Sequence, residues 1–83
     1  MDWIIRYMKG NDPVSAYQNN SNDTRRMIKA ALRYYAAQAH EVRGLFIQLY
    51  GRDHEVIREI DDEVKFASKW IAEYCRAEAM GRD

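Results

Sequence analysis

Few side chains in this sequence combine the types and the spacing that catalysis or metal binding requires. His40 and His54 are the only histidines, and histidine is the side chain best suited to proton transfer near neutral pH. Neither has a glutamate three residues before it, the spacing with which helical bundles hold a di-iron centre. The sequence has no glycine-rich phosphate loop and no nucleophile elbow. We therefore expect no metal site, no cofactor and no catalytic residues.

One pair of residues has the spacing of a known catalytic motif. Six residues separate Arg33 from His40, which resembles the Arg-x(4–6)-His signature of HEPN ribonucleases, an all-helical and dimeric family. The resemblance implies RNA cleavage with Arg33 and His40 as the working pair. It covers eight residues, Tyr34 stands where the family usually has a polar residue, and the family's helical domain is longer than this chain. A HEPN-like ribonuclease is therefore a remote alternative to a function without catalysis.

The composition indicates one compact domain spanning residues 1–83. Thirteen basic and thirteen acidic residues balance, and 47% of the residues are apolar, which excludes a disordered chain. No apolar run approaches the roughly 20 residues of a membrane-spanning helix, and the first residues do not form a signal peptide. The single cysteine, Cys75, cannot form an internal disulfide, and we expect it to be a small buried residue. These features favour a cytoplasmic protein with no membrane association.

The N-terminal quarter of the chain has a short helical pattern followed by a segment rich in turn-forming residues. Residues 1–10 are expected to form a short helix that Asp2 caps and Gly10 ends, with one apolar face made of Trp3, Ile4, Tyr7 and Met8. Residues 11–22 are rich in asparagine and are predicted to be a polar loop. Within it, Asp12-Pro13 is typical of a helix start, which favours a single turn over 14–18.

Two long amphipathic helices account for most of the chain. The first is predicted over 23–50, capped by Asn22 or Asp23 and closed by Gly51, and the second over 53–80, capped by Asp53. The second has apolar residues at steps of three and four, namely Ile57, Ile60, Val64, Ala67, Ile71 and Tyr74. Because the connection is short, the helices must fold back on each other. The sequence thus predicts an all-α fold in which a short helix precedes a long antiparallel hairpin with heptad-like packing.

A two-helix hairpin leaves apolar surface without a cover. Phe66 and Trp70 form a second stripe on the helix over 53–80, turned away from its seam. Either the N-terminal helix covers this stripe, with Trp3 as the covering residue, or the stripe binds another chain. Because a chain of this size buries only about 60 to 65% of its unfolded surface, we also expect a homo-oligomer.

The charged residues are unevenly distributed although the net charge is zero. The outer face of the helix over 23–50 is basic, while acidic residues crowd the start of the helix over 53–80. The predicted partner-binding residues on the basic face are Arg25, Arg26, Lys29, Arg33 and Arg43. This face could meet phosphate or an acidic protein surface.

The absence of a catalytic cluster favours a small non-enzymatic protein-protein interaction module. We expect a regulator or inhibitor that docks on a larger protein or complex through a helix face. Nucleic-acid binding through the basic face is the main alternative, but it is not favoured because DNA-binding domains usually carry a surplus of positive charge and this chain has none.

Overall fold

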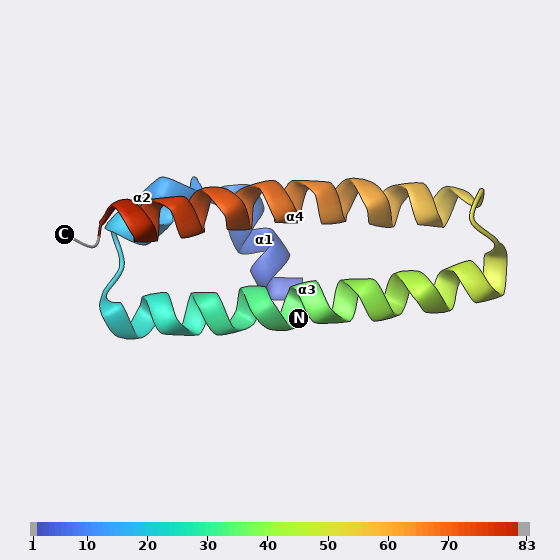
Figure 1. Cartoon of the computed structure of the whole chain (residues 1–83), viewed down its shortest axis with the longest axis horizontal. Helices are drawn as coiled ribbons and strands as arrows, with labels where there is room; N and C mark the ends of the chain where they lie inside the picture. Colours follow the sequence, from blue (N-terminus) through green and yellow to red (C-terminus); the bar gives the residue numbers. More distant parts are fainter. Residues whose placement is uncertain (1, 82–83) are drawn as a thin grey trace.

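The computed structural model describes residues 2–81, and of Asp2 only the backbone. These residues form four helices: α1 (Asp2–Gly10), α2 (Pro13–Gln18), α3 (Asn22–Tyr50) and α4 (Glu55–Met80). The long helices α3 and α4 run in opposite directions along a molecule of 47 × 21 × 17 Å, as Figure 1 shows. The expected all-α class is confirmed. No helix within residues 2–81 is long and apolar enough to cross a membrane.

The helix ends are set by side chains one residue away from the predicted caps. Ser21, rather than Asn22 or Asp23, caps α3, and its hydroxyl accepts a hydrogen bond from the Thr24 N–H at 3.3 Å. His54, rather than Asp53, caps α4, and its Nδ1 accepts from the Val56 N–H at 3.1 Å. Gly51 ends α3 as expected, since its φ of 84° is one that residues with a side chain rarely adopt.

The segment 11–22, predicted as a polar loop with a single helical turn over 14–18, contains the helix α2, which confirms the turn and begins it one residue earlier, at Pro13. The Asp12-Pro13 signal accounts for it, because the Asp12 carboxylate accepts a hydrogen bond from the Ser15 N–H at 3.1 Å. Two of the asparagines in this segment form hydrogen bonds to backbone carbonyls near helix ends. The Asn11 side chain donates to the Tyr7 carbonyl at 2.9 Å, and that of Asn20 donates to the Ala16 carbonyl at 2.6 Å.

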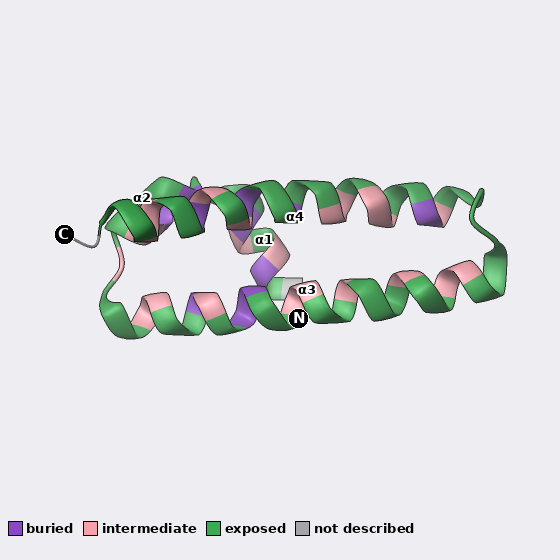
Figure 2. Ribbon diagram, viewed as in Figure 1, coloured by how far each residue is buried: buried purple, intermediate pink, exposed green. Residues whose placement is uncertain are grey.

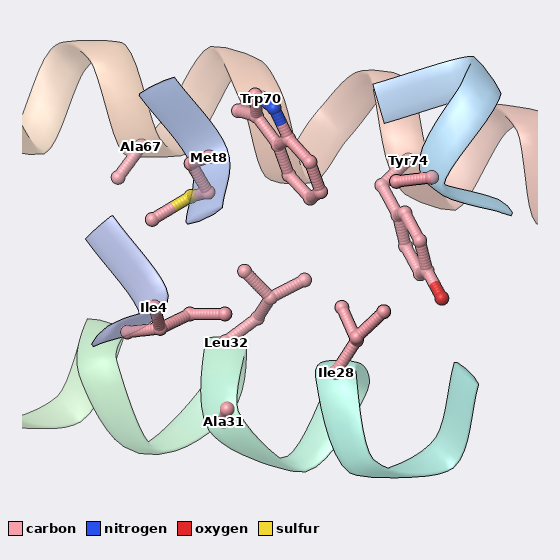
Figure 3. Close-up of a cluster of buried hydrophobic side chains, with 9 residues drawn as sticks. Ile4, Met8, Ile28, Ala31, Leu32, Ala67, Trp70 and Tyr74 are labelled. Carbon is pink, nitrogen blue, oxygen red and sulfur yellow. The ribbon is translucent and has the colours of Figure 1, made fainter. Parts of the chain in front are cut away.

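The hydrophobic core occupies only one half of the molecule (Figure 2). There α1 lies between the two long helices, with Ile4 beside Leu32 of α3 and Met8 beside Trp70 of α4 (Figure 3). The whole cluster consists of Ile4, Met8, Ala16, Ile28, Ala31, Leu32, Ala67, Trp70 and Tyr74. We call this half the head; it comprises residues 2–36 and 67–81.

The other half is a hairpin with no third helix against it. We call residues 37–66 the distal arm; it holds the second half of α3, the turn and the first half of α4. All of its residues are described, and Ile57 is the only buried one among them. The arm contributes no residue to the core cluster of the head. Its apolar side chains are therefore held by two helices alone.

Candidate protein-binding surface

The predicted basic face is divided by contacts within the chain. Arg25 lies over the Tyr17 ring, 4.0 Å from its centroid, and its Nε–H donates to the Tyr17 carbonyl at 2.6 Å. Lys29 forms an ion pair with Glu78 of α4 at 2.9 Å. Both residues therefore join α3 to α2 and α4 instead of presenting a free outer face. Their expected outward orientation is wrong, because both helix positions lie on a flank from which long side chains can turn inward.

Arg43 also has a partner on the neighbouring helix. Its Nε–H donates to the Asp61 carboxylate at 2.6 Å. This hydrogen bond raises the pKa of Arg43 and holds the pKa of Asp61 below its usual range. Of the five predicted basic residues, only Arg26 and Arg33 are exposed. The basic surface is thus smaller than the sequence indicated.

The predicted aromatic stripe separates into a core residue and a surface residue. Trp70 is only 4% exposed, and its indole N–H donates to the Asn11 carbonyl at 2.8 Å. The covering residue is Tyr7, whose ring meets Trp70 edge-on at 6.2 Å. Trp3, which was expected to cover Trp70, is 49% exposed. Phe66 remains at the surface, so the two aromatic residues do not form one binding stripe.

The residues that could take part in catalysis or metal binding do not form a cluster in the fold. Arg33 and His40 are both exposed along α3, and His54 serves as the α4 cap with its ring 4.8 Å from that of Tyr50. Cys75 is exposed, which corrects the expectation of a buried thiol; its position on α4 lies beyond the strip that α2 and α3 cover. Within residues 2–81, no three histidine, cysteine or acidic side chains gather closely enough to hold a metal ion.

A groove lies between α3 and α4, next to the place where α1 packs against them. It is a cleft of about 220 Å³ between the α3 and α4 parts of the distal arm, and Ile5 of α1 closes one end of it. Its surface is about equally polar and apolar. Gln38, Glu63 and Tyr35 contribute polar side-chain atoms, and the other lining residues are Ile5, Ala39, Val42, Ile60 and Val64. The groove continues the space that α1 fills in the head.

Val42 lines this groove, and two further exposed apolar side chains, Leu45 and Leu49, follow it along α3. Val42 is 41% exposed, Leu45 60% and Leu49 72%. Steps of three and four residues place the three side chains on one side of α3. We call them the α3 stripe. Apolar side chains scattered singly over a surface are ordinary, but a contiguous set beside an open groove marks an interaction site.

On α4 the groove is lined by one acidic side chain, Glu63. Burial, followed by the charge and hydrogen bonding of Glu63, raises the pKa of Tyr35 to about 12. Glu55 and Glu59 precede Glu63 on α4 and are exposed. A partner that fits the groove would therefore combine apolar side chains with basic ones.

Comparison with protein-family models, curated proteins and solved structures finds no match. The function is accordingly inferred from the surface that this fold presents.

The seven-residue repeat of Ile28, Tyr35, Val42 and Leu49 predicts one apolar face along the whole of α3, with Leu45 in a neighbouring position. The sequence did indicate that part of this face lacks a cover, because the apolar arc of α3 is wider than contact with one other helix requires. The structure shows that α1 uses this extra width only in the head.

Proposed function

We propose that this chain is a non-enzymatic protein-protein interaction module and that the distal arm is its binding element. The observation that carries the proposal is the exposed α3 stripe beside an open groove, on a molecule whose core cluster lies in the other half. The head would supply the stability and the arm the recognition surface. Such a module acts as a regulator or inhibitor by covering a site on a larger protein or by bridging two surfaces.

The arm has enough apolar surface to support docking. Complete burial of a valine or leucine side chain contributes about 1.5 to 3 kcal/mol relative to its exposed state. The three stripe residues already have 41 to 72% of their surface exposed, so a partner can recover a large part of this contribution at each. The sum is several kcal/mol before the cost of association, which is the range in which a few central residues determine an interface.

The surface supports a protein partner better than a nucleic acid. Arg25, Lys29 and Arg43 have partners within the chain, which leaves Arg26 and Arg33 as exposed members of the basic face. A groove beside the acidic residues of α4 repels phosphate. The nucleic-acid alternative would place binding on the outer side of α3, away from the groove.

Affinity capture from the native host, with a tagged chain and mass spectrometry of what it retains, tests the proposal. The informative variant is Leu45→Glu with Leu49→Glu, which puts two charges into the stripe at positions already exposed. We expect unchanged helicity and loss of the proteins retained by the original chain. The matched control is Arg26→Glu with Arg33→Glu, two charge reversals on exposed positions of the same helix, which should retain them.

The opposite pattern would contradict the proposal. If the control variant loses its partners and the stripe variant keeps them, the basic face is the binding site. Retardation of a random duplex that disappears steeply with added salt and with Arg26→Glu/Arg33→Glu would then identify nucleic acid as the partner. RNA cleavage that stops on His40→Ala would instead establish the ribonuclease.

A further inference from the structure

The face of the hairpin that carries the groove has a step. In the head, α1 packs against both α3 and α4, and α2 packs against α4, whereas no third helix lies along the distal arm (Figure 1). The α3 part of the arm, residues 37–50, is about 20 Å long at 1.5 Å per residue. A body that covers the open face must therefore be a thin helical layer of about this length, and the arm itself has these dimensions.

We propose that this surface binds a second copy of the chain, with the two distal arms laid antiparallel, groove to groove, and the two α3 helices in contact. The inference rests on the proposed function, because it uses the same surface and names its partner. The shape of the chain determines whether the two arms run parallel or antiparallel. In a parallel arrangement the α1 and α2 helices of the two copies would meet and hold the arms apart, whereas in an antiparallel arrangement each thin half covers the other.

The α3 stripe is self-complementary in this arrangement. Val42, Leu45 and Leu49 follow one another at steps of three and four, the spacing of side chains along a helix-helix seam. With a two-fold axis near Leu45, that residue meets its own copy, and Val42 meets Leu49 of the partner subunit. All three exposed side chains are covered at once.

The charge distribution favours the same direction. Residues 37–66 contain seven acidic and four basic residues, whereas the rest of the chain contains nine basic and six acidic ones. Antiparallel arms bring the acidic tip of each arm, with Glu55 and Glu59, toward α1 of the other copy. The outward side of α1 carries Arg6 and Lys9, both exposed. Opposite charges thus meet at both ends of the contact, which sets the register of the two arms.

Sedimentation velocity over a range of protein concentrations tests the proposal with the full chain. We expect a dimer, twice the 9.8 kDa of one chain, at micromolar concentrations. Leu45→Glu should weaken association by at least about 30-fold, as expected for a central contact of about 2 kcal/mol. Arg26→Glu with Arg33→Glu, on the outer side of α3, should leave it unchanged.

A charge exchange tests the antiparallel register independently of stripe burial. The variant Glu55→Lys/Glu59→Lys and the variant Arg6→Glu/Lys9→Glu each change exposed residues, so circular dichroism should show both folded. Each alone should associate more weakly than the original chain. An equimolar mixture should recover association, because each variant restores the opposite charge at one end of the contact.

Three results would overturn this inference. One is a mass of one chain at all concentrations up to hundreds of micromolar; a second is a dimer that Leu45→Glu does not weaken; a third is a mixture no stronger than its components. The proposed function can hold where this inference fails. If the original chain is monomeric but its captured proteins are lost with Leu45→Glu/Leu49→Glu, the groove binds another protein, and a basic amphipathic helix fits the acidic residues of α4 beside it.

Discussion

Trp70 joins α4 to the N-terminal part of the chain through its ring and its indole N–H. It stacks on Tyr74 at 5.5 Å, meets Tyr7 edge-on and donates its indole N–H to the Asn11 backbone. We expect Trp70→Ala to lower the free energy of unfolding by about 3 to 5 kcal/mol, measured by chemical denaturation. Such a loss would unfold many domains of this size.

The control for Trp70 lies one turn earlier on the same helix. Phe66 is 39% exposed and belongs to no core cluster, so Phe66→Ala should cost about 1 kcal/mol or less. Equal losses for the two variants would show that the aromatic stripe is a single packed unit after all.

Tyr35 and Tyr74 should lose their phenolic protons at a higher pH than an ordinary tyrosine does. Burial is the main cause that raises the pKa of Tyr35 to about 12 and also raises that of Tyr74. In the unfolded chain both lose their proton near the ordinary pKa of about 10. The folded state therefore binds more protons than the unfolded state above this pH, and stability should fall as the pH rises from about 10 to 12.

Absorbance at the tyrosinate band measures this titration directly. We expect Tyr35→Phe to remove one late-titrating group and to reduce the loss of stability in alkali. A titration in which Tyr35→Phe removes no group with a raised pKa would contradict the packing of Tyr35 against Glu63.

Individual side chains show why the sequence predicted some details and missed others. Ser21, Asn22 and Asp23 are all good helix caps in consecutive positions, and only backbone geometry decides among them. The exposed Cys75 and the paired Arg43 depended on which flank of a helix faces its neighbours. A single sequence gives the apolar face of a helix but leaves its flanks undetermined.

Among the helices, α1 determines which part of the space between α3 and α4 is filled by a buried core. Ile4 and Met8 are 0% and 1% exposed, and they fill the space between α3 and α4. Removing residues 1–9 should therefore reproduce the destabilisation of Trp70→Ala in thermal unfolding followed by circular dichroism.

Trp3→Ala is the matched control for this deletion. Because Trp3 is 49% exposed, its replacement should cost about 0.5 kcal/mol or less. A truncated chain as stable as the full one would contradict the position of α1 and would leave Trp70 as a surface residue.

The long helices could be predicted within two residues at each end because their apolar periods persist over many turns and glycine follows each of them. The helix α2 was less predictable, because six residues are too few to show a helical period of apolar side chains. Only Asp12-Pro13 indicated its start. The division of the hairpin into head and arm was not predictable. It depends on where α1 crosses the hairpin, and nothing in the periodicity of α3 or α4 specifies that place.

At the scale of the whole molecule, stability and recognition are assigned to different halves. The head contains the core cluster, and the distal arm has an exposed apolar stripe beside an open groove. In such a molecule the arm should open locally at a lower free energy than the head, unless a partner covers it. This division makes the arm sensitive to association and the head insensitive to it.

Hydrogen-deuterium exchange at low and at high protein concentration tests this division most directly. Amides of residues 25–35 and 67–77 should be protected at both concentrations, because they lie in the helices of the core. Those of residues 40–50 and 56–64 should exchange faster in dilute protein and become protected in concentrated protein, as the arms pair. Equal protection of both halves, unchanged by concentration, would contradict the account.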